Sequence, residues 1–134
     1  NIKSAMLASW VSQASFSPPG LSISVAKDRA VESILQKGDS FALNILSSNN
    51  LREPLKRFSK PFAPGEDRFS GLDTKETPNG QIIIPDALAW LDASVKERME
   101  CGDHWVIYAE VKYGNVLNQD DITAVHHRKS GSNY

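Results

Sequence analysis

Hydrophobic and polar residues alternate in several short segments of the chain. Within residues 21–27, the apolar Leu21, Ile23 and Val25 alternate with serines and alanine, and residues 4–13 and 41–46 are rich in apolar side chains. Because successive side chains of a strand point to opposite faces, a period of two predicts strands with one buried face. The prolines and glycine at residues 18–20 predict a tight corner between the first two strands, since proline lacks the backbone donor that a ladder needs.

Three more strands are expected in the second half of the chain, at residues 81–84, 89–99 and 104–117. The last two are long and are separated by residues 101–103 (CGD), a spacing typical of a β-hairpin. Residues 61–80 hold several prolines and glycines among charged side chains, which indicates an irregular excursion beside the core.

Two short helices are expected between the strands. The first covers residues 28–35 and ends near Gly38, a favourable residue after a helix C-terminus. The second has Asn49 or Asn50 as its N-cap and ends before Pro61. Mostly antiparallel strands with short helices predict a mainly β fold, an antiparallel barrel that is closed or nearly closed, because closure leaves no unpaired edge.

Composition fits one soluble domain: of 134 residues, 40% are hydrophobic and 23% are charged. The net charge of -1 gives no global positive field, so we expect neither a nucleic-acid nor a membrane partner. The single cysteine, Cys101, cannot form an intrachain disulfide, and no apolar run approaches the roughly 18 residues of a spanning helix. A cytoplasmic location is therefore the default expectation.

Common catalytic motifs do not occur in the sequence. No serine lies in a Gly-x-Ser-x-Gly elbow, and no glycine-rich loop of the Rossmann or P-loop type is present. The adjacent His126 and His127 would point to opposite faces of a strand, and His104 is distant in sequence, so we expect no metal site. If a nucleotide binds, an architecture other than the Rossmann or P-loop folds must hold it.

The junction at residues 22–30 (SISVAKDRA) is the most informative local feature. A strand ends there in a polar cluster with Lys27 and Arg29, directly before the expected first helix. Backbone N–H groups at a helix start together with two cations favour a phosphate. The alternative is a solvated strand end without a ligand, and the local sequence by itself favours that alternative.

Three separated motifs resemble the flavin-reductase-like, FMN-binding split-barrel domains, and the resemblance covers essentially the whole chain. They are residues 5–29 (AMLASWVSQASFSPPGLSISVAKDR), residues 41–46 (FALNIL) and residues 102–111 (GDHWVIYAEV). Residues 100–111 and 123–134 are especially similar to the C-terminal domain of cyanobacterial flavodiiron proteins. The resemblance implies that residues 1–134 form one split-barrel domain whose N-terminal strand region, usually found upstream, is missing.

The resemblance also assigns residues to a flavin site. Ser9, Trp10 and Val11 would present donors to the pyrimidine edge of the flavin, and Asn44 fits a polar position at the third strand. His104 matches a histidine on the nicotinamide side. The residues implied around the FMN phosphate are Ser24, Ala26, Lys27 and Arg29.

Structural roles remain open for three of these residues. Trp10 could be plain core packing, Asn44 a turn residue, and His104 the start of a strand held by Asp103. The chain also departs from many stand-alone flavin reductases, which have serine or threonine where this chain has Ala8 and Trp10. The bulk of Trp10 affects how the flavin would stack.

The function implied by the resemblance is an NAD(P)H-dependent flavin reductase. Electrons would pass from NAD(P)H to FMN and then to a flavodiiron core or another acceptor. FMN is expected as the flavin rather than FAD. A homodimer is also expected, because the apolar faces of the long strands exceed what one small barrel hides. The alternative from another class is a non-catalytic flavin- or haem-binding split barrel that acts as an interaction module.

Overall fold

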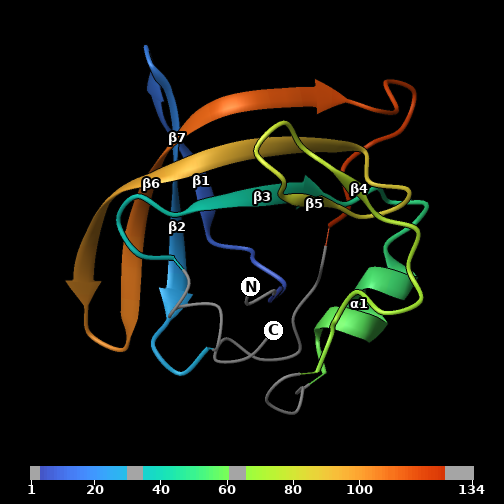
Figure 1. Cartoon of the computed structure of the whole chain (residues 1–134), viewed down its shortest axis with the longest axis horizontal. Coiled ribbons are helices and arrows are strands. Elements are labelled where there is room, and N and C mark those ends of the chain that lie inside the picture. Colours follow the sequence, from blue (N-terminus) through green and yellow to red (C-terminus); the bar gives the residue numbers. More distant parts are fainter. Residues whose placement is uncertain (1–3, 30–34, 61–65, 126–134) are drawn as a thin grey trace.

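A curled antiparallel sheet is the main element of the computed structural model, which describes residues 4–29, 35–60 and 66–125. The strand order is β1-β2-β7-β6-β3. Figure 1 shows that the long strands β6 and β7 bend strongly, so that the sheet wraps around its inner side. The bounds are Val11–Phe16 for β1, Pro19–Ala26 for β2, Ser40–Ile45 for β3, Ala89–Cys101 for β6 and His104–Val116 for β7.

Smaller elements border this sheet. The helix α1 (Arg52–Phe58) follows β3, and a two-stranded sheet is formed by β4 (Lys75–Glu76) and β5 (Ile82–Ile83). The fully buried carboxylate of Asp92 on β6 accepts hydrogen bonds from the side chains of Thr77 and Asn79. This buried network ties the excursion before β5 to the main sheet.

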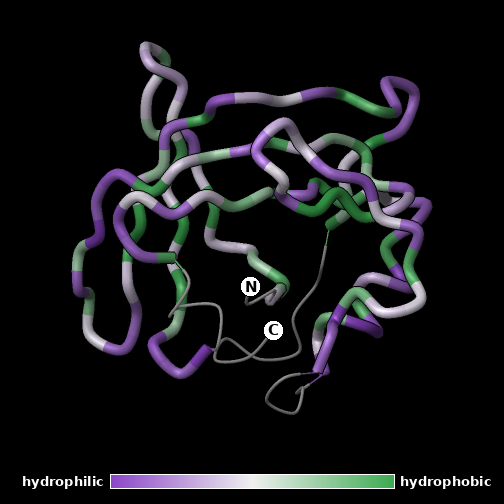
Figure 2. Tube along the Cα trace, viewed as in Figure 1, coloured by the Kyte–Doolittle hydropathy of each residue, from purple (hydrophilic) through white to green (hydrophobic). Residues whose placement is uncertain are grey.

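The core lies on the inner side of the curled sheet. Alternate residues of β2 are buried, as the period of two predicts, and β6 and β7 contribute Val95, Ile107 and Ala109, none of which is exposed. A second cluster under α1 contains Phe58, Ile84 and Ala87. Hydrophilic residues concentrate at the chain reversals, including the end of the β6–β7 hairpin (Figure 2). The mainly β, antiparallel split-barrel fold expected from the sequence is confirmed.

The first predicted strand is wrong over residues 4–10, which have no regular secondary structure. Their side chains still alternate, because Met6 and Ala8 pack against the main core while Ala5 and Leu7 pack against the second cluster. The residue-by-residue ladder with β2 begins only at Val11. An alternating pattern therefore indicated which side chains are buried but not whether the backbone has a ladder partner.

The helix predictions are partly outside the described residues. Residues 30–34 of the expected first helix are not described, and the preceding residues form a turn in which Arg29 N–H donates to the Ala26 carbonyl, 3.1 Å. The second helix does end before Pro61, with Ser59 as its C-cap. Its N-cap is Leu51 without a side-chain cap, so the expectation of an asparagine cap was wrong.

The predicted hairpin between β6 and β7 is present, and its turn has two residues rather than the three that separate the predicted strands. Cys101 pairs with His104, which leaves Gly102 and Asp103 in the turn. Gly102 has a φ of 60°, whereas Asp103 does not have a positive φ. A positive φ at the first turn position alone defines type II′, where glycine avoids the strain of a Cβ atom.

Candidate functional site

The outer face of β2 and β7 carries small and polar side chains opposite the buried core. Ser24 and Ala26 alternate with the buried residues Ile23 and Val25 of β2 and therefore point outward. Ala26 pairs directly with His104, and Ser24 pairs with Val106. Residues directly opposite each other on a ladder have Cβ atoms only about 5 Å apart, so the side chain of His104 stands beside that of Ala26.

Trp10 reaches the same face from the chain just before β1. The Ser24 backbone N–H donates to the Trp10 carbonyl, 3.0 Å, which fixes Trp10 beside β2. The Trp10 and His104 rings meet with centroids 4.8 Å apart and planes tilted by 32°. The two residues come from segments on either side of β2, and Ala26, the ladder partner of His104, adds only a small side chain next to this contact. We call Trp10, Ser24, Ala26 and His104 the outer site.

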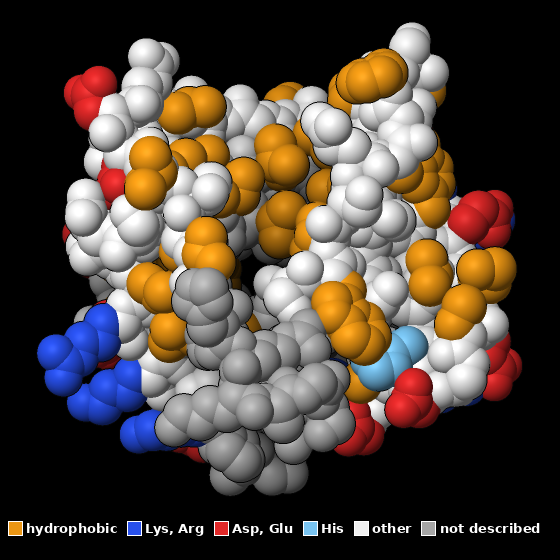
Figure 3. All heavy atoms as spheres, turned by 180° about the vertical axis from the view of Figure 1, so that it is seen from behind, with side chains coloured by type: hydrophobic (Ala, Val, Ile, Leu, Met, Phe, Trp, Pro, Cys, Tyr) orange, Lys and Arg blue, Asp and Glu red, His pale blue; other side chains and the backbone are white. Residues whose placement is uncertain are grey.

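The outer site is partly open to solvent. Trp10 is 45% exposed, whereas the His104 side chain is 19% exposed. The space-filling view shows the histidine side chain at the surface beside hydrophobic and acidic side chains (Figure 3). A planar aromatic group could therefore contact this site without displacing core residues.

His104 is held from the turn side by Asp103. The Asp103 Oδ1 atom lies 2.7 Å from His104 Nδ1. The pKa of the Asp103 carboxyl lies below its usual value, and this hydrogen bond is the largest cause. The alternative role considered for His104, a ring held by Asp103, is thus present in the structure. It coexists with a position in the outer site.

Lys27 does not direct its ammonium into the outer site. Lys27 Nζ lies 2.5 Å from Glu100 Oε1 and 5.4 Å from the centroid of Trp105, which packs against the inner core. The pKa of Glu100 lies below its usual value, and the hydrogen bond from Lys27 is the largest cause. The ion pair is solvent-exposed, with side chains 34% and 65% exposed, and such pairs contribute little stability. The ammonium can therefore exchange partners at small cost.

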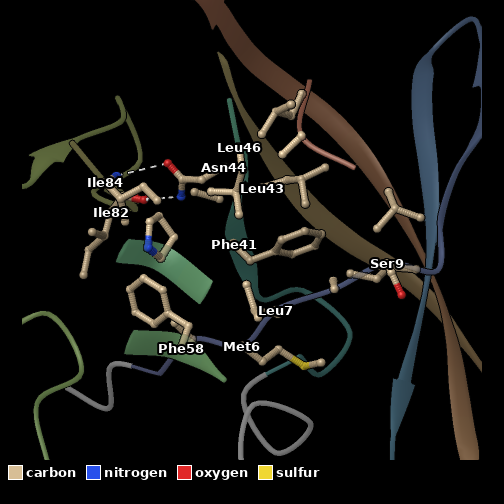
Figure 4. Close-up of a pocket in the computed structure, with 18 of the residues that line it drawn as sticks. Met6, Leu7, Ser9, Phe41, Leu43, Asn44, Leu46, Phe58, Ile82 and Ile84 are labelled. Carbon is tan, nitrogen blue, oxygen red and sulfur yellow. Dashed lines mark hydrogen bonds between the residues drawn. The ribbon is translucent and has the colours of Figure 1, made fainter. Parts of the chain in front are cut away.

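The side-chain amide of Asn44 forms hydrogen bonds with backbone groups at and directly after β5. Its Nδ2 donates to the Ile82 carbonyl, 3.0 Å, and its Oδ1 accepts from the Ile84 N–H, 3.1 Å. Figure 4 shows both hydrogen bonds at the rim of an apolar cavity. The amide holds β3 and β5 together, and its role toward a flavin stays a prediction.

The apolar cavity lies inside the curled sheet and has a volume of about 700 Å³. Leu7, Phe41, Leu43 and Phe58 are among its lining residues (Figure 4). Of the residues assigned to the flavin site by sequence, Ser9, Val11 and Asn44 line this cavity, and the others do not. This cavity is thus distinct from the outer site, because side chains alternate between the two faces of the same strands.

Arg68 is a cation that sequence reasoning missed. Its Nη1 donates to the Ala5 carbonyl, 63 positions earlier in the chain. Burial is the largest cause that lowers the pKa of Arg68; nearby Glu66 opposes this shift, and Arg29 adds to it. Arg29, predicted near the phosphate, therefore lies close enough to Arg68 for the two guanidinium groups to repel. No local sequence pattern links Arg68 to residues 4–10.

The described part of the chain contains neither a metal-binding cluster nor a membrane-spanning helix. Within it, no three His, Cys, Asp or Glu side chains gather in a way that could hold a metal ion. The described residues also include no helix with the length and apolar character needed to cross a bilayer. His126 and His127 lie outside the described residues.

Comparison with known proteins decides the family. The model of the flavin reductase like domain matches residues 2–133. The chain belongs to this family. The flavin reductase-like domain is 59% identical over 133 residues to a diflavin flavoprotein of Nostoc sp. and 55% identical to diflavin flavoprotein A 1 of Synechocystis sp., covering 99% of this chain in each case. The resemblance found in the sequence motifs is confirmed.

The flavin reductase-like domain spans only 23% of the length of each of these two relatives. Among solved structures, it is similar to an NADH:FAD oxidoreductase of Streptomyces globisporus. The TM-score is 0.81 and the identity 26%, over 88% of this chain and 70% of that chain. An oxidoreductase of Sinorhizobium meliloti is 28% identical, with a TM-score of 0.75, over 89% of this chain and 40% of that chain.

Proposed function

We propose that this domain binds FMN at the outer site and transfers electrons from NAD(P)H through it. The observation that carries the proposal is the contact between the Trp10 and His104 rings, next to Ala26, the ladder partner of His104. The two rings are partly exposed beside small side chains, so a third ring system could contact them, and a larger residue at Ala26 would reduce that contact. The related NADH:FAD oxidoreductase of S. globisporus supports the same reaction class.

The protein groups have separable roles in this proposal. When bound, FMN supplies the hydride chemistry, so the chain needs no acid–base pair of its own. Trp10 and the neighbouring backbone of Ser9 and Val11 would orient the ring system. His104 would hydrogen-bond the nicotinamide, and the Ala26–Arg29 turn would hold the phosphate.

The electron acceptor is proposed to lie in the remainder of a longer protein. The relatives named diflavin flavoproteins are about four times as long as the matched region. We infer that the acceptor is a second flavin in a flavodiiron core fused to this domain. The homodimer also stays a prediction.

Lys27→Met is expected to weaken FMN binding about tenfold, with little effect on riboflavin. A charge-assisted hydrogen bond contributes about 1.5 kcal/mol or more, which corresponds to about a tenfold change in affinity. Glu100 offers a matched variant, because its carboxylate forms an ion pair with Lys27 in the structure. Glu100→Gln removes the competing carboxylate and should strengthen FMN binding by a few-fold. Both variants are titrated with FMN and riboflavin by flavin fluorescence.

Opposite effects of the two variants on FMN alone would support a phosphate role for Lys27. Equal weakening of FMN and riboflavin by Lys27→Met would show that the ion pair with Glu100 only stabilises the hairpin. An FMN affinity within twofold of the parent in both variants would remove Lys27 from the site.

A further inference from the structure

Asp103 is placed to control which ring nitrogen of His104 carries a proton. The carboxylate lies 2.7 Å from Nδ1, the ring nitrogen nearer the backbone, and not from Nε2. The two side chains differ in exposure, because His104 is 19% exposed whereas Asp103 is 95% exposed. Asp103 therefore approaches the imidazole from solvent, and the Trp10 ring contacts it with a centroid separation of 4.8 Å.

The backbone that carries Asp103 is itself fixed. Gly102, with a φ of 60°, sets the type II′ turn in which Asp103 is the second central residue. The Asp103 carbonyl also accepts a hydrogen bond from the Lys27 N–H, 3.0 Å, which ties the turn to the end of β2. A carboxylate on such a doubly held turn stays near His104 with a smaller loss of side-chain freedom than one on a free loop.

The contact determines the protonation pattern of the ring. The pKa of Asp103 lies below its usual value, so this group is an ionised carboxylate at neutral pH and can only accept hydrogen bonds. His104 Nδ1 must then carry a proton. In the neutral ring the other nitrogen, Nε2, consequently has a free lone pair and acts as an acceptor.

We propose that Asp103 is a positioning residue that holds His104 as the Nδ1–H tautomer and so presents Nε2 as an acceptor for the carboxamide N–H of nicotinamide. The proposal deepens the proposed function and rests on it. A histidine that instead carried its proton on Nε2 would present a donor there, and the carboxamide would have to turn its oxygen toward the ring to form a hydrogen bond. Asp103 acts through His104 and does not touch the cosubstrate.

The first test reads the tautomer directly, without any cosubstrate. Nitrogen-15 chemical shifts of the His104 ring distinguish protonated from unprotonated nitrogens. The parent protein is expected to show a protonated Nδ1 and an unprotonated Nε2 above the titration of the ring, and Asp103→Ala is expected to shift the population toward Nε2–H. A parent ring already protonated on Nε2 would overturn the proposal.

The second test measures flavin reduction by NADH and NADPH in the FMN-loaded protein. Asp103→Ala should raise the KM for the nicotinamide about three- to tenfold, as expected for one lost hydrogen bond, with kcat less affected. Asp103→Asn, whose amide oxygen can still accept from Nδ1, should recover part of the loss. Glu97→Gln is the charge-matched control, because Glu97 pairs with Lys37 on an exposed part of β6. It should leave KM unchanged.

The outcomes separate the proposal from the function on which it rests. If Asp103→Ala changes the tautomer but not KM, while His104→Ala raises KM, the positioning role is wrong and the outer site stands. If neither variant changes KM, the nicotinamide does not contact His104, and the proposed function of the outer site fails with the proposal.

Discussion

Ala26→Leu is expected to weaken flavin binding about tenfold to a hundredfold while the domain stays folded. Ala26 lies directly opposite His104 on the ladder, and the His104 ring contacts the Trp10 ring. We expect three additional carbon atoms there to displace the His104 ring or to occupy the space proposed for the cofactor. Overpacking of this kind costs about 1–3 kcal/mol, which corresponds to the stated range of affinity.

A matched control for this substitution is Ser12→Leu. Ser12 is exposed on β1, and a leucine there adds the same side chain two residues from Trp10 without lying between the rings. We expect FMN affinity within about twofold of the parent for Ser12→Leu. Isothermal titration with FMN, together with circular dichroism of both variants, checks the result. Unchanged FMN binding by a folded Ala26→Leu variant would place the cofactor elsewhere.

Ile107→Ala is expected to lower the free energy of unfolding by about 2–5 kcal/mol. Ile107 on β7 is fully buried in the main cluster between β2 and β6, so truncation loses apolar burial and leaves a cavity. The control is Ile122→Ala, the same change at a side chain that is 71% exposed, where about 0.5 kcal/mol or less is expected. Urea unfolding followed by tryptophan fluorescence measures both. Equal effects at the two positions would contradict the assignment of the core.

The strands and the buried positions could be predicted from sequence, because they depend on local alternation. Residues 21–27 illustrate this, since the period of two identified both β2 and its buried side chains. The same pattern misled at residues 4–10, where the side chains alternate but the backbone forms no ladder with β2. Pairing is a property of two segments, and one segment cannot reveal it.

The candidate site was predictable only in part, for a similar reason. The resemblance brought Trp10, Ala26 and His104 into one proposed site, and the structure places these three together. It could not reveal that Lys27 pairs with Glu100, which lies 73 positions away, or that Asn44 is engaged by the loop at β5. Those contacts depend on the register of strands that are distant in sequence, and neither residue has a local signature for them.

The most direct test of the central claim is anaerobic mixing of the FMN-loaded protein with NADH and with NADPH, followed through the blue absorbance band of the flavin. The account predicts bleaching at a rate that saturates with at least one nicotinamide and exceeds that of free FMN under the same conditions. Ala26→Leu should lower the amplitude, because less flavin is bound. A purified protein that retains no flavin, or bound flavin reduced no faster than free FMN by either nucleotide, would contradict the account. A haem Soret band in its place would favour the interaction module.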